Sequence, residues 1–153
     1  MKLVFATHNL GKLQEVRELL SPDYEVIGLN DLGDHEEIEE TALTLEGNAW
    51  IKARTVWENH GLSCFSDDTG LEIEALNNAP GVFSARYAGQ AKSPDANMDK
   101  VLNELKGVKN RKARFRTAVA LVLKGEEFLF EGTVQGEITS VRSGVKGFGY
   151  DPI

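Results

Sequence analysis

Two adjacent carboxylates, Asp67 and Asp68, lie between two apolar stretches near the middle of this 153-residue chain. Residues 62–65 are mostly apolar and residues 71–75 alternate between apolar and charged side chains, which predicts a strand on each side. We therefore expect the first strand to end at the aspartates and the chain to turn at Thr69 and Gly70. Adjacent side chains of an extended chain point to opposite faces. One aspartate is thus expected to face a cleft and the other to support the turn.

Carboxylates at the end of a strand can bind Mg²⁺, which prefers oxygen ligands and keeps several of its waters for chemistry. The same residue types also build an ordinary turn, in which Asp, Thr and Gly form local hydrogen bonds. A motif of this length does not separate the two interpretations, so both a metal site and a simple turn stay open at this point.

Length and composition indicate one soluble globular domain, or one domain with an additional lobe. Apolar residues make up 41% of the chain and charged residues 27%, as in ordinary soluble proteins. The net charge of -7 argues against binding to a nucleic-acid duplex. We find no secretory signal and no apolar stretch long enough to cross a membrane, so a cytoplasmic location is expected. The single cysteine, Cys64, is expected to be a buried, unreactive thiol.

The N-terminal part of the chain has the pattern of a strand, a short polar loop and a helix. Residues 2–6 predict a buried strand, and Ser21 and Pro22 end the helix. Residues 7–12 would present backbone N–H groups and the positive end of the helix dipole to an anion, with the Lys12 ammonium nearby. The alternative is an ordinary helix start capped by Thr7 or Asn9. The apolar face of this helix is expected to contain Leu13, Val16, Leu19 and Leu20.

A second strand is expected at residues 24–28, followed by an acidic segment over residues 34–40. Most of this segment is expected to be a solvated loop, with Glu39 and Glu40 best placed to bind a metal. A helix is predicted over residues 45–59. Lys52 lies one residue away from the apolar stripe of this helix and is expected either to reach into a cleft or to be exposed. The stripe consists of Ala49, Ala53, Val56 and Trp57.

The second half of the chain predicts a structured loop over residues 78–89, in which Arg86 would contact a phosphate or pair with a carboxylate. Ser93 and Pro94 have the pattern of an N-cap and a first-turn proline, and Gly107 would end the helix that follows. The remaining residues predict an antiparallel meander of strands over residues 113–123, 127–132 and 133–141.

The chain ends in a glycine-rich stretch, residues 144–153, that contains two aromatic rings and one carboxylate. Phe148 and Tyr150 could stack on a planar base, with Asp151 beside them. Alternatively, the stretch is a glycine-rich turn whose aromatic rings fill the core.

Six segments of the chain occur in the order seen in one family. The chain resembles the inosine/xanthosine triphosphate pyrophosphatases, which are housecleaning enzymes for non-standard purine nucleotides, and the resemblance extends from Met1 to Ile153. Six motifs in register are far more specific than any one of them. The segments are residues 6–12 with Glu15, 39–41, 48–49 with 52–53, 66–71, 80–87 and 148–152.

The resemblance implies an α/β fold with a long, mixed, partly antiparallel sheet flanked by helices, and two lobes with a central substrate cleft. It implies Mg²⁺-dependent hydrolysis of dITP, ITP or XTP to the nucleoside monophosphate and pyrophosphate. It also implies a homodimer that acts on a small purine nucleoside triphosphate. Together with the net charge and the lack of an apolar spanning stretch, this predicts a cytoplasmic protein whose partner is neither a nucleic acid nor a membrane.

The resemblance further assigns roles to individual residues. Asp68 would bind the metal and would orient and deprotonate the attacking water, with Glu40 as the second metal ligand. The other expected contacts are Thr7, His8, Asn9, Leu10, Gly11 and Lys12 with the triphosphate, Lys52 and Thr69 with the substrate, and Phe148, Gly149, Tyr150 and Asp151 with the base.

Two features depart from the family pattern. His8 stands where many relatives carry glycine, so that a side chain would lie beside the phosphates. The sequence stops at Ile153, whereas relatives continue with a substrate-contacting lysine, a Ser-His-Arg motif and a last helix. We therefore expect a single pyrophosphatase domain over residues 1–153, truncated at its C-terminus. Such a chain is expected to have weaker base selectivity and an exposed apolar face where that helix would dock.

Three other interpretations compete with this one. A haloacid-dehalogenase-type phosphatase also uses a strand-end aspartate and Mg²⁺, but its two aspartates are separated by one residue near the N-terminus. A Maf-like nucleotide pyrophosphatase would have a similar architecture with a different base preference. A non-catalytic nucleotide-binding module is the third alternative, because of the missing C-terminal segment.

Overall fold

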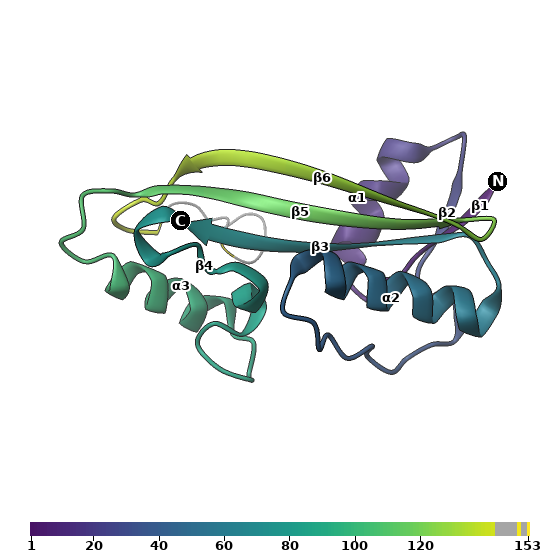
Figure 1. Ribbon diagram of the computed structural model, residues 1–153, viewed down its shortest axis with the longest axis horizontal. Coiled ribbons are helices and arrows are strands. Elements are labelled where there is room, and N and C mark those ends of the chain that lie inside the picture. Colours follow the sequence, from purple (N-terminus) through teal and green to yellow (C-terminus); the bar gives the residue numbers. More distant parts are fainter. Residues whose placement is uncertain (143–149, 151–152) are drawn as a thin grey trace. The chain divides into compact units, whose positions relative to one another are not determined.

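A computed structural model describes residues 1–142, 150 and 153 of the chain (Figure 1). It contains two compact units, each with its own apolar core. Unit 1 comprises Met1–Asp68 and Ala118–Glu131, and unit 2 comprises Thr69–Thr117 and Gly132–Ile153. Both units include residues of three long strands, β3 (Cys64–Ile73), β5 (Lys112–Leu123) and β6 (Glu126–Glu137).

The strands form one mixed sheet of order β2-β1-β3-β5-β6, and β4 pairs with β3. β1 (Lys2–Phe5) pairs in parallel with β2 (Glu25–Ile27) and with β3. β4 (Ala79–Pro80) pairs antiparallel with β3. The combination of parallel and antiparallel pairs with flanking helices confirms the expected mixed α/β fold.

Two helices pack in unit 1. α1 (Leu10–Leu20) buries Leu13 against Phe5 and Val26, with Val16 and Leu20 beside them. Leu19 is 80% exposed, so its predicted place on the apolar face is wrong. The reason is the helical period: Leu13, Val16 and Leu20 follow each other at spacings of three and four residues, whereas Leu19 is rotated by about 100° from Leu20.

The second helix of unit 1, α2 (Leu45–His60), begins at the N-cap Thr44 and ends at Gly61, whose φ of 64° is left-handed. The predicted stripe is confirmed for Ala49, Ala53 and Val56, which are buried, whereas Trp57 is half-buried. Figure 1 shows α2 running beside β3. The Cys64 thiol of β3 is fully buried and donates to the carbonyl oxygen of Ala53 at 3.1 Å. The predicted burial of Cys64 is thereby confirmed, and burial raises the pKa of this thiol to about 11, as expected for an unreactive cysteine.

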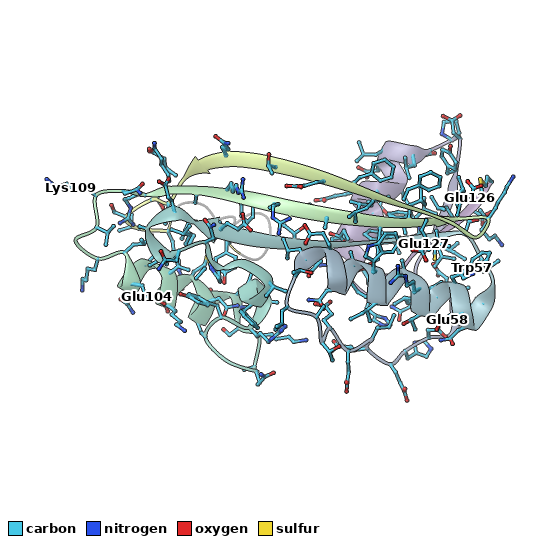
Figure 2. The ribbon with its side chains drawn as sticks, viewed as in Figure 1. Trp57, Glu58, Glu104, Lys109, Glu126 and Glu127 are labelled. Carbon is cyan, nitrogen blue, oxygen red and sulfur yellow. The ribbon has the colours of Figure 1, made fainter. Side chains whose placement is uncertain are left out.

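The turn between β5 and β6 packs against the end of α2. Lys124 and Gly125 both have positive φ, at 52° and 88°, which suits a two-residue hairpin turn. A Cβ built on Gly125 would lie 3.5 Å from the Trp57 ring, and Arg54 forms an ion pair of 2.7 Å with Glu127. Figure 2 shows Trp57 near the end of α2 and Glu127 at the start of β6. The hairpin makes β5 and β6 antiparallel neighbours.

Unit 2 packs α3 (Pro94–Glu104) on a core from β3, the chain after β6 and the C-terminal residues. Ser93 caps α3, as predicted. The segment over residues 78–89 is more regular than the predicted loop, because it contains β4 and the 3₁₀-helix η3 (Gly81–Arg86). Such short elements carry too few residues to show a period in the sequence. The buried core residues are Leu71, Ile73, Met98, Val101, Leu105, Ile138, Tyr150 and Ile153.

Two predicted breaks in strands are wrong. β3 continues from Cys64 to Ile73, so the predicted strand end and turn at Asp67–Gly70 do not occur. β6 likewise runs through Gly132 as one strand, rather than as two strands joined by a glycine. In both places pairing with neighbouring strands outweighs the local turn preference of Asp, Thr and Gly. β6 is exposed along its whole length, including Phe128, Phe130 and Val134.

We expect Gly47→Ala to lower the free energy of unfolding by about 1 kcal/mol, because overpacking outweighs the gain in helix propensity. A Cβ at Gly47 would lie 2.6 Å from the Cβ of Ala42 and 3.0 Å from Thr44 Oγ1. Gly132→Ala is the control, since nothing lies within 4 Å of its Cβ. Urea unfolding of both variants checks this prediction. Equal stability of the two variants would contradict the close packing at Gly47.

Candidate functional site

The two adjacent aspartates of β3 have different partners. Asp67 Oδ2 accepts a hydrogen bond from Lys12 Nζ of α1 at 3.0 Å. Asp68 interacts instead with Asn48 and Lys52 of α2, and with Glu40. This separation follows from the extended backbone, on which successive side chains point to opposite faces. The expected division of roles between the two aspartates is therefore compatible with a continuous strand, although no turn is present for Asp67 to support.

The start of α1 follows β1 directly and is built by local hydrogen bonds. Thr7 Oγ1 accepts from the Asn9 backbone N–H at 3.0 Å, and Asn9 Oδ1 accepts from the Lys12 backbone N–H at 3.1 Å. Asn9 is therefore the N-cap. The N–H groups of Leu10 and Gly11 have no intrahelical acceptor at this position. With no acidic residue in the first turn, this helix start favours an anion in front of it.

The Lys12 side chain brings a positive charge to the same end of α1. A cation is unfavourable at a helix N-terminus by itself. Here its ammonium is 3.0 Å from Asp67 Oδ2, and the two side chains are 27% and 16% exposed. Asp67 thus holds Lys12 in place beside the helix start, where the ammonium can also neutralise a bound anion.

Both ring nitrogens of His8 contact oxygen atoms of other residues in unit 1. Nδ1 lies 3.2 Å from Asn30 Oδ1, and Nε2 lies 3.1 Å from the carbonyl oxygen of Glu36. Because a carbonyl oxygen only accepts hydrogen bonds, Nε2 carries the proton of that contact. His8 therefore ties the loop after β1 to the acidic segment. Its predicted contact with a phosphate stays a prediction.

Lys52 is mostly buried, so the predicted alternative of an exposed lysine is wrong, and its reach into a cleft stays a prediction. Its side chain is 14% exposed, and Nζ donates to the backbone carbonyl of Asp67 at 2.6 Å. The same ammonium lies 3.2 Å from Glu40 Oε1. Of the two glutamates predicted as metal ligands, Glu40 is half-buried and belongs to this cluster, whereas Glu39 is exposed.

Asn48 lies one helical turn before Lys52 and completes the cluster. It is fully buried, and its Oδ1 accepts from the Ala42 backbone N–H at 2.9 Å. Within the described part of the chain, Asn48 Nδ2 and Asp68 Oδ2 are both buried without a hydrogen-bond partner. The sequence analysis assigned Asn48 no role. Its spacing of four residues from Lys52 was the available signal, because that spacing places both side chains on one face of a helix.

The surroundings of Asp68 change its acidity. Burial raises its pKa from the ordinary 3.8 to about 6, opposed by the positive charge of Lys52. The negative charge of Glu40 raises the pKa further, the nearby Asn48 amide lowers it, and Asp67 raises it slightly. A carboxylate in such a place is held in an unfavourable charged form near neutral pH. It is thereby prepared to accept a proton or to bind a cation.

The carboxylates of Asp68 and Glu40 fit a divalent metal. Asp68 Oδ2 is a buried acceptor without a partner, and Glu40 is close enough to raise the pKa of Asp68. Among the residues that the structure describes, no group of three or more His, Cys, Asp or Glu side chains could hold a metal by itself. Mg²⁺ is commonly held by one or two carboxylates together with substrate phosphates and water, so two carboxylates suffice.

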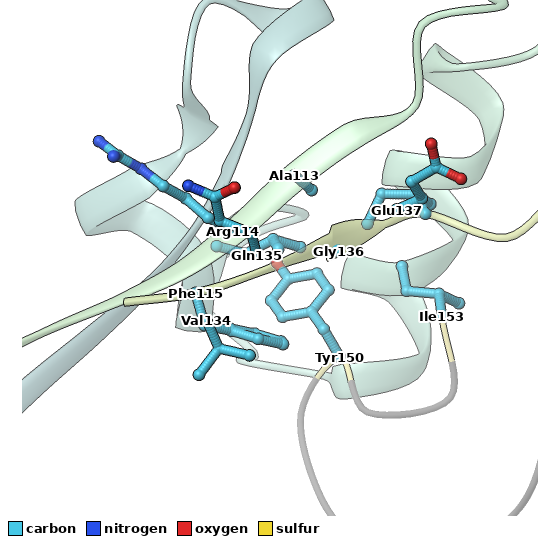
Figure 3. Close-up of a pocket in the computed structure, with 11 residues that line it drawn as sticks. Ala113, Arg114, Phe115, Val134, Gln135, Gly136, Glu137, Tyr150 and Ile153 are labelled. Carbon is cyan, nitrogen blue, oxygen red and sulfur yellow. The ribbon is translucent and has the colours of Figure 1, made fainter. Parts of the chain in front are cut away.

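Two further predicted site residues, Thr69 and Tyr150, belong to unit 2. Thr69 Oγ1 lies 2.8 Å from Thr117 Oγ1. Tyr150 is 7% exposed and donates its hydroxyl hydrogen to the carbonyl oxygen of Ser84 at 2.6 Å. Its ring lines an apolar pocket of about 180 Å³ with Phe115 and Val134 (Figure 3). Tyr150 thus fills the core, whichever further role it has. Phe148, Gly149 and Asp151 lie outside the described residues.

Arg86 is one more residue that the sequence analysis singled out. Its guanidinium lies over the Phe83 ring, 5.2 Å from the ring centre. A cation over an aromatic face is a favourable contact of its own. Among the described residues, no ion pair joins Arg86 to a carboxylate, which was one of its two predicted contacts, and its contact with a phosphate stays a prediction.

We expect Asp68→Asn to stabilise the metal-free protein at pH 8. The pKa of Asp68 in the folded protein, about 6, exceeds the ordinary 3.8. The free energy of unfolding is therefore highest below pH 3.8 and falls as the pH rises from there to about 6. Asparagine removes that loss, and the gain at pH 8 is expected to be about 1–3 kcal/mol. Urea unfolding at pH 4 and pH 8 with a chelator measures it. A gain of equal size at both pH values, or the same profile for the exposed control Asp23→Asn, would contradict the raised pKa.

Among the described residues, no helix is both long enough and apolar enough to span a membrane.

Comparison with known proteins places the chain in a family. The Ham1 family pattern matches residues 3–153. A relative from Christiangramia forsetii, named dITP/XTP pyrophosphatase, is 52% identical over 153 residues, covering 100% of this chain and 80% of the relative. A relative of the same name from Flavobacterium johnsoniae is 49% identical over the same share of both chains. The solved Ham1 protein of Staphylococcus aureus is 41% identical with a TM-score of 0.89, covering 100% of this chain and 80% of that structure. The chain belongs to the Ham1 family.

Proposed function

We propose that this chain hydrolyses non-standard purine nucleoside triphosphates, such as dITP, ITP and XTP, to the nucleoside monophosphate and pyrophosphate. The names of its Ham1 relatives support this activity and substrate class. The structural observation that carries the proposal is the buried Asp68 carboxylate, whose unpartnered oxygen lies in a cluster with Glu40, Asn48 and Lys52. It can accept a proton at the pH of the cell.

The start of α1 would bind the triphosphate. The N–H groups of Leu10 and Gly11 and the Lys12 ammonium can neutralise phosphate oxygens, and Thr7 and Asn9 keep the loop in shape. Phosphoryl transfer depends mainly on positioning and on charge stabilisation, both of which such a cradle supplies. His8 would contribute its backbone, since its ring is bound to Asn30 and Glu36.

Glu40 and Asp68 would hold Mg²⁺, which when bound supplies positive charge against the phosphate oxygens. Asp68 would orient a water molecule and accept a proton from it, while the oxygen atom of that water attacks the α-phosphorus atom. The bond between the α-phosphorus and the bridging oxygen then breaks, and pyrophosphate leaves. Lys52, which already binds Glu40 and the Asp67 carbonyl, would offset the growing negative charge.

The residues from Phe148 to Asp151 would contact the base, and Thr69 would contact the substrate, as the family resemblance implies. We further propose a cytoplasmic homodimer that acts on free nucleotides rather than on nucleic acid. The net charge of -7 supports the last point, because a polyanion would be repelled unless a basic face compensated.

The reaction is tested by following pyrophosphate release from ITP with Mg²⁺. We expect pyrophosphate rather than orthophosphate, and we expect Asp68→Asn to lower kcat by at least about 10²-fold, the lower limit for loss of a general base. Release of orthophosphate would indicate a phosphatase, and no release would indicate a binding module. Faster turnover of dTTP or UTP than of ITP would favour the Maf-like alternative. Near-normal turnover by Asp68→Asn with metal still bound would remove Asp68 from the proposed role.

We expect Lys12→Met to lower kcat/KM for ITP by about 10-fold or more, because a charge-assisted hydrogen bond contributes roughly 1.5–3 kcal/mol. The loss should be accompanied by weaker inhibition by inorganic triphosphate, which shares only the phosphate chain with the substrate. Lys106→Met is the matched control, since that lysine is exposed in unit 2. Equal kinetics for the two variants would show that Lys12 does not bind the phosphates.

A further inference from the structure

Asn48 is a buried polar side chain on α2 whose hydrogen bonds are only half formed. Its Oδ1 accepts from the Ala42 backbone N–H at 2.9 Å. Because a backbone N–H can only donate, this contact decides which end of the amide is the oxygen. The Nδ2 group therefore points away from Ala42, and within the described residues it is buried without an acceptor.

A second buried asparagine shows what a purely structural role looks like. Asn97 of α3 is 3% exposed, and its Oδ1 accepts from the Ala88 backbone N–H at 2.8 Å. Its Nδ2 donates to the carbonyl oxygens of Ser84 and Ala85, at 3.3 and 2.9 Å. Both ends of Asn97 are thus satisfied by the backbone, whereas Asn48 keeps its donor for something else. Buried donors are rarely left unpaired unless they have a use.

The acceptor that matches Asn48 lies in the same cluster. Asp68 Oδ2 is likewise buried and, among the described residues, without a partner. Asn48 lies one helical turn before Lys52 on the same face of α2, and Lys52 Nζ donates to the carbonyl oxygen of Asp67, the residue that precedes Asp68. The two orphaned atoms form no hydrogen bond of standard geometry within the described part of the chain. The Asn48 donor and the Asp68 acceptor are both excluded from solvent, and a hydrogen bond between them would satisfy both groups.

We propose that Asn48 is a positioning residue for the hydrolysis proposed above, whose Nδ2 group donates to Asp68 directly or through one water. Its Oδ1 fixes that donor to the backbone two residues after Glu40. The amide therefore connects the segment of one carboxylate to the side chain of the other. The Asn48 amide keeps the Glu40 and Asp68 carboxylates in a constant arrangement while the charge on the reacting groups changes. It need not touch the substrate. This inference rests on the proposed function for its kinetic consequence only.

The kinetic test compares Asn48→Asp with Asn97→Asp. Aspartate has the shape of asparagine and can still accept from the Ala42 N–H, but it offers no N–H to Asp68. We expect Asn48→Asp to lower kcat by about 10–100-fold, as for other residues that orient a ligand, with KM changed by less than about threefold. Asn97→Asp is expected to lose stability and to keep kcat. An unchanged kcat in Asn48→Asp, or an equal loss of kcat in both variants, would overturn the proposal.

A spectroscopic test needs no substrate and compares the wild-type chain with Asp68→Ala, so that Asn48 itself is unchanged. The side-chain amide signals of Asn48 and Asn97 are assigned in an ¹⁵N–¹H correlation spectrum by their loss on substitution or by backbone-linked assignment. We expect Asp68→Ala to shift the Asn48 signals and to leave those of Asn97 in place. Unchanged Asn48 signals would overturn the proposal even if Asn48→Asp fails to fold. If the wild-type chain releases no pyrophosphate, the proposed function fails, but this test still decides whether Asn48 binds Asp68.

Discussion

The burial of the Asp68 carboxylate in the middle of β3 is the constraint on which the rest of the site depends. A buried charge is unfavourable unless nearby groups compensate for it, and burial alone raises the pKa of Asp68. The compensation comes from α2, through the Lys52 ammonium and the Asn48 amide. Since Lys52 also binds the Asp67 carbonyl and Glu40, one ammonium joins the strand, the helix and the acidic segment.

The charges around this strand are suited to a metal and a polyphosphate together. Three carboxylates, Asp67, Asp68 and Glu40, face two ammonium groups, Lys12 and Lys52. The pair of Lys12 and Asp67 lies at the start of α1, and among the described residues the other two carboxylates share the Lys52 ammonium. A divalent cation would compensate for the second carboxylate, and a triphosphate would then occupy the positive end of α1. Positioning of both ligands is what phosphoryl transfer chiefly requires.

Much of this arrangement was predictable from sequence, because local patterns determine local elements. The strand, loop and helix of residues 2–20, the N-caps Asn9 and Ser93, and the buried Cys64 were all indicated by residue type and spacing. The two wrong predictions of strand ends have a common cause. Strand ends at Asp67–Gly70 and at Gly132 were inferred from local turn preference, which pairing with distant strands overrides. The ion pair of Lys12 with Asp67 and the orphaned amide of Asn48 could not be predicted, since both depend on contacts that only the folded chain forms.

The acidity of Asp68 tests the central claim most directly, because it reports burial, Lys52, Glu40 and Asn48 at once. The ¹³C carboxyl resonances of metal-free protein, with Asp68 assigned by its loss in Asp68→Asn, can be followed as the pH is raised. We predict a midpoint of about 6 for Asp68. A midpoint near the ordinary pKa of 3.8 would contradict the account, since the carboxylate would then not be held in an unfavourable charged form at all.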